Sequence, residues 1–439
     1  MKKNSLTKIA LVNHGCAKNL VDSELMLGLL TQEGFEITLD DNKADVVIIN
    51  TCSFIHDAEK ESVQSILAMV DKGKKVVITG CLPQKHKDEL KKAIPEAVAM
   101  VGTSDISEIV DVVKKVLAGE GYICKISDEP IYIYPENSQR QQITVGSSSY
   151  VKIAEGCNYC CGYCIIPQLR GPYRSRKIEN IVAEVKQLGE KGVSEIVLIA
   201  QDTTGYGQDL YGKPSLAKLL VELNKIEEIN WIRVMYTYPS TFNDELIEVF
   251  ASCDKVVKYV DIPLQHSHPE MLKLMRRPVN DYRAFIKKLR AKIPNIAIRT
   301  TFVVGYPGET DEMFNDLYEF VKDAKFNKMG AFEFSKEKNT YAYDLPNQIP
   351  ARIKKQRKNK LMKLQQQISL EINQKFIGQT LPCIIEAVSP DGQVIARSYA
   401  DAPEVDGLVY IETSQNPVPG DIEQVKIVGF DEYDLYGEL

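Results

Sequence analysis

Short apolar runs alternate with longer amphipathic stretches between Lys8 and about Ala118. Three runs have the length and content of buried strands, at 9–12, 46–50 and 76–79. Amphipathic stretches with apolar residues at helical spacing lie between them, at 19–32 and 58–70. Because strands and helices alternate, this region is predicted to form a parallel sheet with helices on its faces.

The same alternation returns from Tyr150 to about Ser335. Six runs are typical of strands, at 151–154, 195–200, 232–236, 258–262, 298–304 and 329–334. Six strand–helix units predict a partial barrel, open where an eight-unit barrel would close. Active residues of such a barrel are expected at the C-terminal ends of its strands.

The end of the chain has a different pattern. A long helix is expected over 347–374, because Leu361, Leu364, Ile368 and Ile372 recur at spacings of three and four. Its first half is basic, which a solvated helix face explains most simply. Short strands and turns after Leu381 predict a small five-stranded barrel.

The fold class is therefore α/β with an appended β-barrel. Four segments are expected: an N-terminal domain, a linker, a central barrel domain and a C-terminal barrel, at 6–120, 121–142, 143–373 and 376–439.

Composition narrows the class of protein. The chain has 439 residues, 44% of them hydrophobic, and a formal net charge of −6. It lacks an apolar run of about 18 residues, so we expect neither secretion nor membrane insertion, and a cytoplasmic location. Ten cysteines in such a chain favour metal or redox chemistry over a disulfide framework.

Cys157, Cys161 and Cys164 form a CxxxCxxC motif directly after a predicted strand. Three thiolates on one loop can hold three irons of a cubane cluster and leave the fourth iron open for a ligand. Two alternatives remain: a zinc site, although no histidine lies in the loop, and a redox pair made of Cys161 and Cys164.

Three further cysteines follow predicted strands of the N-terminal region. Cys16, Cys52 and Cys81 each come within a few residues of a strand end. Since the ligand-bearing ends of parallel strands lie along one edge of a sheet, these thiols are predicted to form a second three-thiolate site. The alternative is that each is a small buried residue.

Polar residues also follow the other strands of the predicted barrel. They are Gln201 and Asp202, Gln265 and His266, Arg299, and the segment 305–309. Each could bind a cofactor or substrate, or could only complete a turn.

Taken together, these motifs resemble the methylthiotransferase family of radical S-adenosylmethionine (SAM) enzymes. The likeness covers nearly the whole chain. It rests on the segments 15–19, 21–24, 50–52 and 79–81, on 156–164, 165–167 and 170–176, and on a C-terminal part similar to the TRAM module.

The resemblance implies two 4Fe-4S clusters and SAM as cofactors. Cys157, Cys161 and Cys164 would hold the cluster that cleaves SAM, and Cys16, Cys52 and Cys81 an auxiliary cluster that carries or supplies sulfur. A reductant protein and a sulfur donor would be partners. Position alone suggests Tyr163, Gln201 and Arg299 as SAM contacts, while the catalytic residues are unknown.

Relatives modify either an adenosine in tRNA or an aspartate of ribosomal protein uS12. The segments 261–266 and 397–407 resemble the ribosomal-protein enzyme. From Lys375 onward, three Lys or Arg stand against twelve Asp or Glu, a net charge of −9. Such a module would repel phosphates, so tRNA is not the expected partner and uS12 is. The acidic surface could also serve only solubility. For the protein as a whole, the alternative function from another class is an iron–sulfur electron carrier or redox sensor.

Several residues depart from the family pattern or lie outside it. Cys160 is an additional thiol inside the signature and is expected to be a bystander. Asn339 stands where the family often has glycine, and asparagine tolerates the left-handed backbone that such a turn needs. The remaining cysteines are expected to be structural: Cys124, Cys253 and Cys383.

Overall fold

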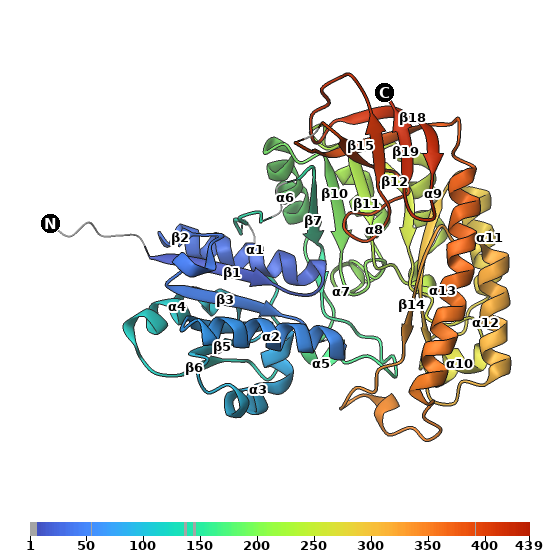
Figure 1. The fold of residues 1–439 in the computed structure, drawn as a ribbon. Coiled ribbons are helices and arrows are strands. Elements are labelled where there is room, and N and C mark those ends of the chain that lie inside the picture. The colour runs from blue at the N-terminus through green and yellow to red at the C-terminus, as the bar shows by residue number, and fades with distance from the viewer. Residues whose placement is uncertain (1–6, 54, 136–137, 144–145, 391) are drawn as a thin grey trace. The chain divides into compact units, whose positions relative to one another are not determined.

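A computed structural model describes residues 7–53, 55–135, 138–143, 146–390 and 392–439. Figure 1 shows the order of the elements along the chain. The chain forms two compact units. The first comprises Met1–Thr144, Glu155–Tyr159 and Ile165–Arg174, and the second comprises Val145–Ala154, Cys160–Cys164 and Ser175–Leu439.

The first unit is a parallel sheet with strand order β2-β1-β3-β4-β5-β6. Its strands are β1 (Lys8–Asn13), β2 (Glu36–Ile37), β3 (Val46–Thr51), β4 (Lys75–Gly80), β5 (Ala99–Val101) and β6 (Ile123–Lys125). The helices are α1 (Ala17–Gln32), α2 (His56–Asp71), α3 (Cys81–Ala93), α4 (Ile109–Ala118) and the short α5 (Ile166–Arg170). The predicted parallel-sheet domain is thus confirmed, and β6 falls inside the segment expected to be a linker.

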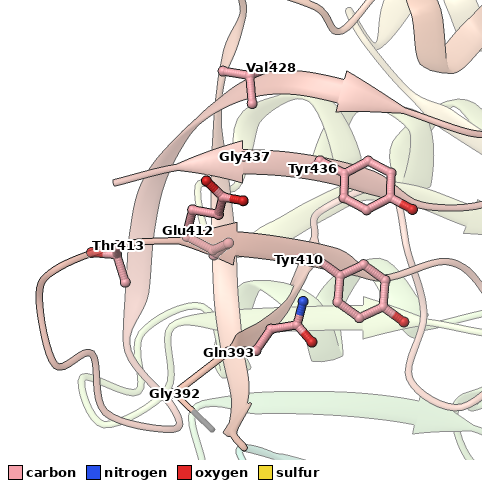
Figure 2. Close-up of a pocket in the computed structure, with 9 residues that line it drawn as sticks. Gly392, Gln393, Tyr410, Glu412, Thr413, Val428, Tyr436 and Gly437 are labelled. Atoms are coloured by element: carbon pink, nitrogen blue, oxygen red, sulfur yellow. The ribbon is translucent and has the colours of Figure 1, made fainter.

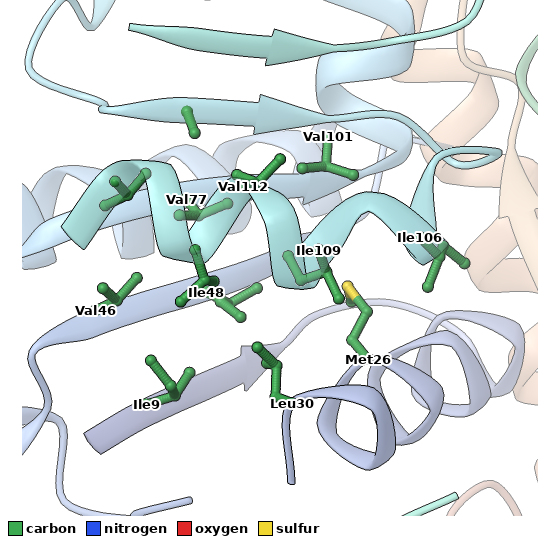
Figure 3. Close-up of a cluster of buried hydrophobic side chains, with 13 residues drawn as sticks. Ile9, Met26, Leu30, Val46, Ile48, Val77, Val101, Ile106, Ile109 and Val112 are labelled. Atoms are coloured by element: carbon green, nitrogen blue, oxygen red, sulfur yellow. The ribbon is translucent and has the colours of Figure 1, made fainter. Parts of the chain in front are cut away.

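Two apolar layers hold this sheet between its helices. Every residue of β3 is buried, and its side chains alternate between the faces. Val46 and Ile48 join one cluster with Met26 of α1 and Val112 of α4, as Figure 3 shows. Their neighbours along β3 join a second cluster, with Ile66 of α2. A strand buried on both faces reads as a continuous apolar run, which is why the sequence reveals it.

The second unit contains a six-stranded parallel sheet in the order β14-β13-β12-β11-β10-β7. Its strands are β7 (Ser148–Lys152), β10 (Glu195–Ile199), β11 (Trp231–Val234), β12 (Val256–Asp261), β13 (Ala297–Val304) and β14 (Lys328–Glu333). Apart from these, β8 (Ala154–Glu155) pairs with β9 (Arg174–Ser175). Strands that neighbour one another in sequence also pair in the sheet, so the expected open barrel of six strand–helix units is confirmed.

Helices follow the strands of the second unit. They are α6 (Ile178–Glu190), α7 (Gln208–Tyr211), α8 (Leu216–Leu223), α9 (Asp244–Ser252), α10 (Pro269–Leu274), α11 (Tyr282–Lys292) and α12 (Asp311–Ala324). The long helix α13 (Ala351–Gln374) packs on β14 and α12. Within the described residues, no helix has the length and apolar content that crossing a bilayer requires.

The C-terminal strands close into a barrel in the order β15-β16-β17-β19-β18. They are β15 (Thr380–Val388), β16 (Val394–Ser398), β17 (Val409–Glu412), β18 (Ile422–Phe430) and β19 (Leu435–Glu438). Two ion pairs join this barrel to the sheet of the same unit: Arg397 contacts Glu195 in the buried interior (2.6 Å), and Asp401 contacts the partly buried Lys328 (2.6 Å). The five-stranded barrel predicted from the sequence is confirmed, and ion pairs attach it to the sheet.

Candidate metal centres

Cys16, Cys52 and Cys81 lie along one edge of the sheet in the first unit. Cys52 and Cys81 directly follow β3 and β4, and Cys16 follows β1 after a short loop. These three strands are parallel neighbours, so the chain leaves all of them on the same side of the sheet. The structure therefore places the three cysteines after the ends of neighbouring strands, and their role as metal ligands stays a prediction.

Close backbone packing fixes the Cys16 loop against β3. Gly15 has φ +100°, and a Cβ at this position would lie 2.8 Å from the Cβ of Cys52. Glycine is required there, because any side chain would push the two cysteine loops apart. Asn19, in the first turn of α1, donates a hydrogen bond from its amide to the Thr51 carbonyl (3.0 Å). The loops are thus held by contacts that need no metal.

Arg170, at the end of α5, reaches this edge of the sheet. It is almost completely buried, and its Nη2 lies 3.6 Å from the Cys81 thiol and 2.6 Å from Asn19 Oδ1. Its Nη1 donates to Asp22 (2.6 Å) and lies 3.4 Å from Glu155. One guanidinium therefore contacts a candidate ligand and is held in place by two carboxylates and an amide.

The charges near the thiols act on them differently. Burial raises the pKa of Cys81, and Arg170 only partly offsets this effect. Desolvation also opposes ionisation of Cys16, but Lys18 and Arg170 outweigh it, so the pKa of Cys16 lies below its ordinary value. The edge of the sheet thus provides cations that stabilise thiolates, which are the form that binds iron.

A cubane cluster suits this set of donors. Among the described residues, no three His, Cys, Asp or Glu side chains converge as ligands of a single metal ion would. In a cubane each thiolate binds a different iron, so the three sulfurs need only surround the cluster. The three cysteines are free thiols that follow separate strands, and the buried guanidinium of Arg170 beside Cys81 is a cation that favours an anionic iron–sulfur cluster.

The CxxxCxxC signature is divided between the two units. Cys157 belongs to the first, where its N–H donates to the Gly171 carbonyl (3.1 Å). Cys161 and Cys164 belong to the second. There, Gly162 donates to the Met275 carbonyl (2.8 Å) and accepts from Ala342 (2.7 Å). Backbone hydrogen bonds therefore hold both parts of the loop.

Arg277 lies beside the part of the signature that belongs to the second unit. Its Nη1 is 3.7 Å from the Cys161 thiol and 3.4 Å from the Tyr163 hydroxyl. The guanidinium stacks over the ring of Tyr238, 4.4 Å from the centroid. Burial raises the pKa of Tyr163 well above its ordinary value, so this residue can act as a neutral hydrogen-bonding group.

The other expected SAM contacts have protein neighbours. Gln201 is the second residue after β10, because Ala200 lies between it and the end of the strand. Arg299, on β13, pairs with Asp261 (2.8 Å) and, through Nε, with Asp406 of the C-terminal barrel (3.3 Å). The proposed contacts to SAM stay predictions for Tyr163, Gln201 and Arg299. The guanidinium of Arg299 already pairs with two carboxylates of the protein.

The turn after β13 is fixed from within the protein. Glu309 contacts His266 (3.2 Å), accepts from the Gly305 N–H (2.7 Å) and pairs with Arg357 of α13 (2.5 Å). All three side chains are buried. Glu309 and His266 therefore stabilise this turn. Completing a turn is one of the two roles that the sequence leaves open for them, the other being to bind a cofactor or substrate.

Comparison with known proteins matches each part of the chain. Residues 8–102 match the uncharacterized protein family UPF0004, residues 151–321 the radical SAM superfamily, and residues 377–439 the TRAM domain. The ribosomal protein uS12 methylthiotransferase RimO of Acaryochloris marina is 48% identical, over 98% of each chain. The chain belongs to the RimO methylthiotransferase family. The RimO proteins of Microcystis aeruginosa and Desulforamulus reducens are 48% and 47% identical, and the latter alignment covers 99% of this chain and 100% of that protein.

More distant radical SAM enzymes share the fold of this RimO family member. The radical SAM methyltransferase TsrM from Kitasatospora setae aligns with a TM-score of 0.58 at 15% identity, over 85% of this chain and 79% of its own. The cobalamin-dependent enzyme OxsB aligns with a TM-score of 0.51 at 12% identity, over 82% of this chain and 56% of its own. At these identities the likeness concerns the fold alone.

The sequence did not identify the arginines of this RimO family member that contact its cysteines. In the sequence, Arg170 stands out only as part of the motif segment 170–176, and Arg277 belongs to no motif. Both contact residues more than 80 positions away in sequence. Contacts between residues so far apart in sequence leave no periodic pattern. The position of Arg170, directly before a glycine and close to the signature, was nevertheless a usable signal of a functional role.

Proposed function

We propose that this chain transfers a methylthio group to the β-carbon of an aspartate in ribosomal protein uS12, using two 4Fe-4S clusters and SAM. One observation supports this reaction most: the chain has a second cysteine triad, at the ends of β1, β3 and β4, separate in sequence from the CxxxCxxC signature. Simple SAM cleavage would need only the signature.

We assign Cys157, Cys161 and Cys164 to the cluster that binds SAM, and Cys16, Cys52 and Cys81 to the auxiliary cluster. When bound, these groups supply a radical able to abstract hydrogen from an unactivated carbon, together with the sulfur. The protein's own residues hold the loops, place Arg277 beside Cys161 and Arg170 beside Cys81, and fix the turn at Glu309. A reductant protein and a sulfur donor complete the reaction, which we place in the cytoplasm.

The charge of the C-terminal barrel favours a basic protein as the substrate. Its net charge of −9 from Lys375 onward would repel the phosphates of tRNA and attract a basic partner. Figure 2 shows a pocket on this barrel in which Tyr410 and Tyr436 lie side by side, with Glu412 nearby. The two rings stack 5.8 Å apart, and the pocket has a volume of about 410 Å³. Aromatic faces and a carboxylate are suitable partners for Lys and Arg side chains.

The substrate is tested directly by mass spectrometry. Cluster-reconstituted protein is incubated with SAM, a reductant and a sulfide source, and with either purified uS12 or bulk tRNA. We expect uS12 to gain the mass of one methylthio group less that of the hydrogen it replaces, on a single aspartate, and tRNA to remain unmodified. A methylthio-adenosine in the tRNA digest, with unmodified uS12, would contradict the proposal.

The pocket on the C-terminal barrel gives a second prediction. Exchanging the exposed Glu412 for lysine should raise the KM for uS12 roughly tenfold, the equivalent of about 1.4 kcal/mol. It should leave SAM cleavage without substrate unchanged. Asp421→Lys is the matched control, because it makes the same charge change at an exposed position outside the pocket. Equal KM values for both variants would exclude a specific role of the pocket.

An iron–sulfur electron carrier or sensor is the competing function. A carrier would hold both clusters without cleaving SAM. The formation of 5'-deoxyadenosine by the dithionite-reduced protein, measured by chromatography in the absence of any substrate, therefore separates the two. We expect this product, whereas a reduced, fully loaded protein that left SAM intact would favour the carrier.

A further inference from the structure

Arg170 is held at the auxiliary cysteine site by contacts on every side. Leu169, its neighbour in α5, packs with Ile165 against Cys81, and the Leu169 carbonyl accepts a hydrogen bond from Thr103 (2.5 Å). Gly171 follows with φ +72°, where a Cβ would lie 1.9 Å from the Pro130 carbonyl oxygen. The main chain on both sides of Arg170 is thus fixed, so its side chain enters the site from one defined point.

The two halves of the guanidinium have different partners. Nη1 contacts the carboxylates of Asp22 and Glu155, whereas Nη2 contacts the Asn19 amide oxygen and the Cys81 thiol. The two carboxylates fix the plane of the guanidinium, and this orientation directs Nη2 toward the sulfur of Cys81. A lysine could not hold both sets of partners, because its ammonium is a single point charge.

The charges around this arginine have a consequence for an iron–sulfur cluster. Asp22 and Glu155 are buried carboxylates, and an all-thiolate cluster adds further negative charge. Hydrogen bonds to the sulfurs and nearby positive charge stabilise the reduced cluster and therefore raise its reduction potential. Arg170 provides both effects at Cys81, and Lys18 adds positive charge near Cys16. Loss of Arg170 would leave the two carboxylates beside the cluster without this cation.

We propose that Arg170 is a positioning residue of the auxiliary cluster, which orients the Cys81 thiolate and keeps the reduction potential of that cluster high. The inference rests on the proposed function, in which Cys16, Cys52 and Cys81 hold a cluster. It assigns a specific task to the segment that follows the CxxxCxxC signature: Arg170 comes six residues after Cys164 and serves the other cysteine triad.

The test isolates the auxiliary cluster. In a parent protein with Cys157, Cys161 and Cys164 replaced by alanine, only the strand-end triad remains to bind iron. Redox titration of the reconstituted parent, followed by electron paramagnetic resonance, gives the potential of this cluster. Arg170→Gln should shift the potential to a more negative value, and Arg170→Lys should give a smaller shift in the same direction.

Arg140 provides the matched control. It is also buried in the same unit, and it pairs with a buried carboxylate, Glu24 (2.5 Å), whereas Arg170 lies beside the Cys81 thiol. Arg140→Lys should leave the potential unchanged. If Arg170→Gln does not fold, Arg170→Lys decides the question.

Different results would contradict the role of Arg170 and the presence of a cluster at Cys16, Cys52 and Cys81. A loaded cluster whose potential is the same with Arg, Lys and Gln at position 170 would overturn the inference alone. A shift of equal size in the Arg140 variant would also overturn it, because the effect would then report general destabilisation. A folded parent that binds no cluster would overturn both the inference and the assignment of the auxiliary site.

Discussion

Replacing Cys16, Cys52 and Cys81 together by alanine is expected to abolish methylthio transfer to uS12 while reductive cleavage of SAM continues. The signature cysteines lie elsewhere in the sequence and keep their own backbone contacts, such as Gly162 to Met275. In the proposed reaction the strand-end triad has no part in generating the radical, whereas every product molecule needs the sulfur that its cluster carries or supplies. The expected loss of product is complete, and 5'-deoxyadenosine should still form.

Both products are measured in one reaction, by mass spectrometry of uS12 and chromatography of the nucleoside. The control variant replaces three cysteines that belong to neither triad: Cys124, Cys160 and Cys253. It should retain both activities. If the strand-end variant kept methylthio transfer, or if it lost SAM cleavage together with it, the division of labour between the triads would be refuted.

Replacing Glu195 by glutamine is expected to lower the free energy of unfolding strongly, and far more than replacing an exposed glutamate. Glu195 is completely buried and binds Arg233 (2.7 Å) and Arg397 (2.6 Å). Removing its charge leaves Arg233 buried with an uncompensated charge, and breaking a buried pair in this way costs about 3–5 kcal/mol. Because Arg397 belongs to the C-terminal barrel, the loss should also weaken the attachment of that barrel to β10.

The urea midpoint of unfolding, followed by circular dichroism, measures this effect. Glu222→Gln is the control, because Glu222 forms an exposed pair with Lys225 and such pairs contribute about 0–1 kcal/mol. A midpoint for the Glu195 variant as close to wild type as that of the Glu222 variant would show that the buried network contributes little.

The same network predicts a dependence on pH. Burial alone would raise the pKa of Glu195, but Arg397 and Arg233 hold it at about 2, below the ordinary 4.5. A carboxyl whose pKa is lowered on folding stabilises the folded state fully above pH 4.5 and loses that contribution as the pH falls toward 2. The difference in urea midpoint between wild type and Glu195→Gln should therefore shrink over this range.

The sequence predicts those features that depend on local pattern. The strands are found because buried parallel strands are continuous apolar runs, and each cysteine of the N-terminal triad is found because it stands next to such a run. Asn339 indeed has φ +63°, as its chemistry allows. The confirmed family follows from motifs of this kind.

Contacts between distant parts of the chain could not be predicted in this way. The basic half of α13 was expected to face solvent, yet Arg357 is buried against Glu309. Arg299 was expected to contact SAM, and its pairing with Asp406 joins residues more than 100 positions apart. Charge alone does not say which cation is solvated and which is paired, because this depends on the tertiary packing.

Iron and acid-labile sulfide analysis of the two triads tests the central claim, that this chain carries two independent clusters. Wild-type protein should bind about eight iron atoms after reconstitution. The variant lacking Cys16, Cys52 and Cys81 and the variant lacking Cys157, Cys161 and Cys164 should each bind about four. Full iron content in the first variant, or none in either, would contradict two separate sites.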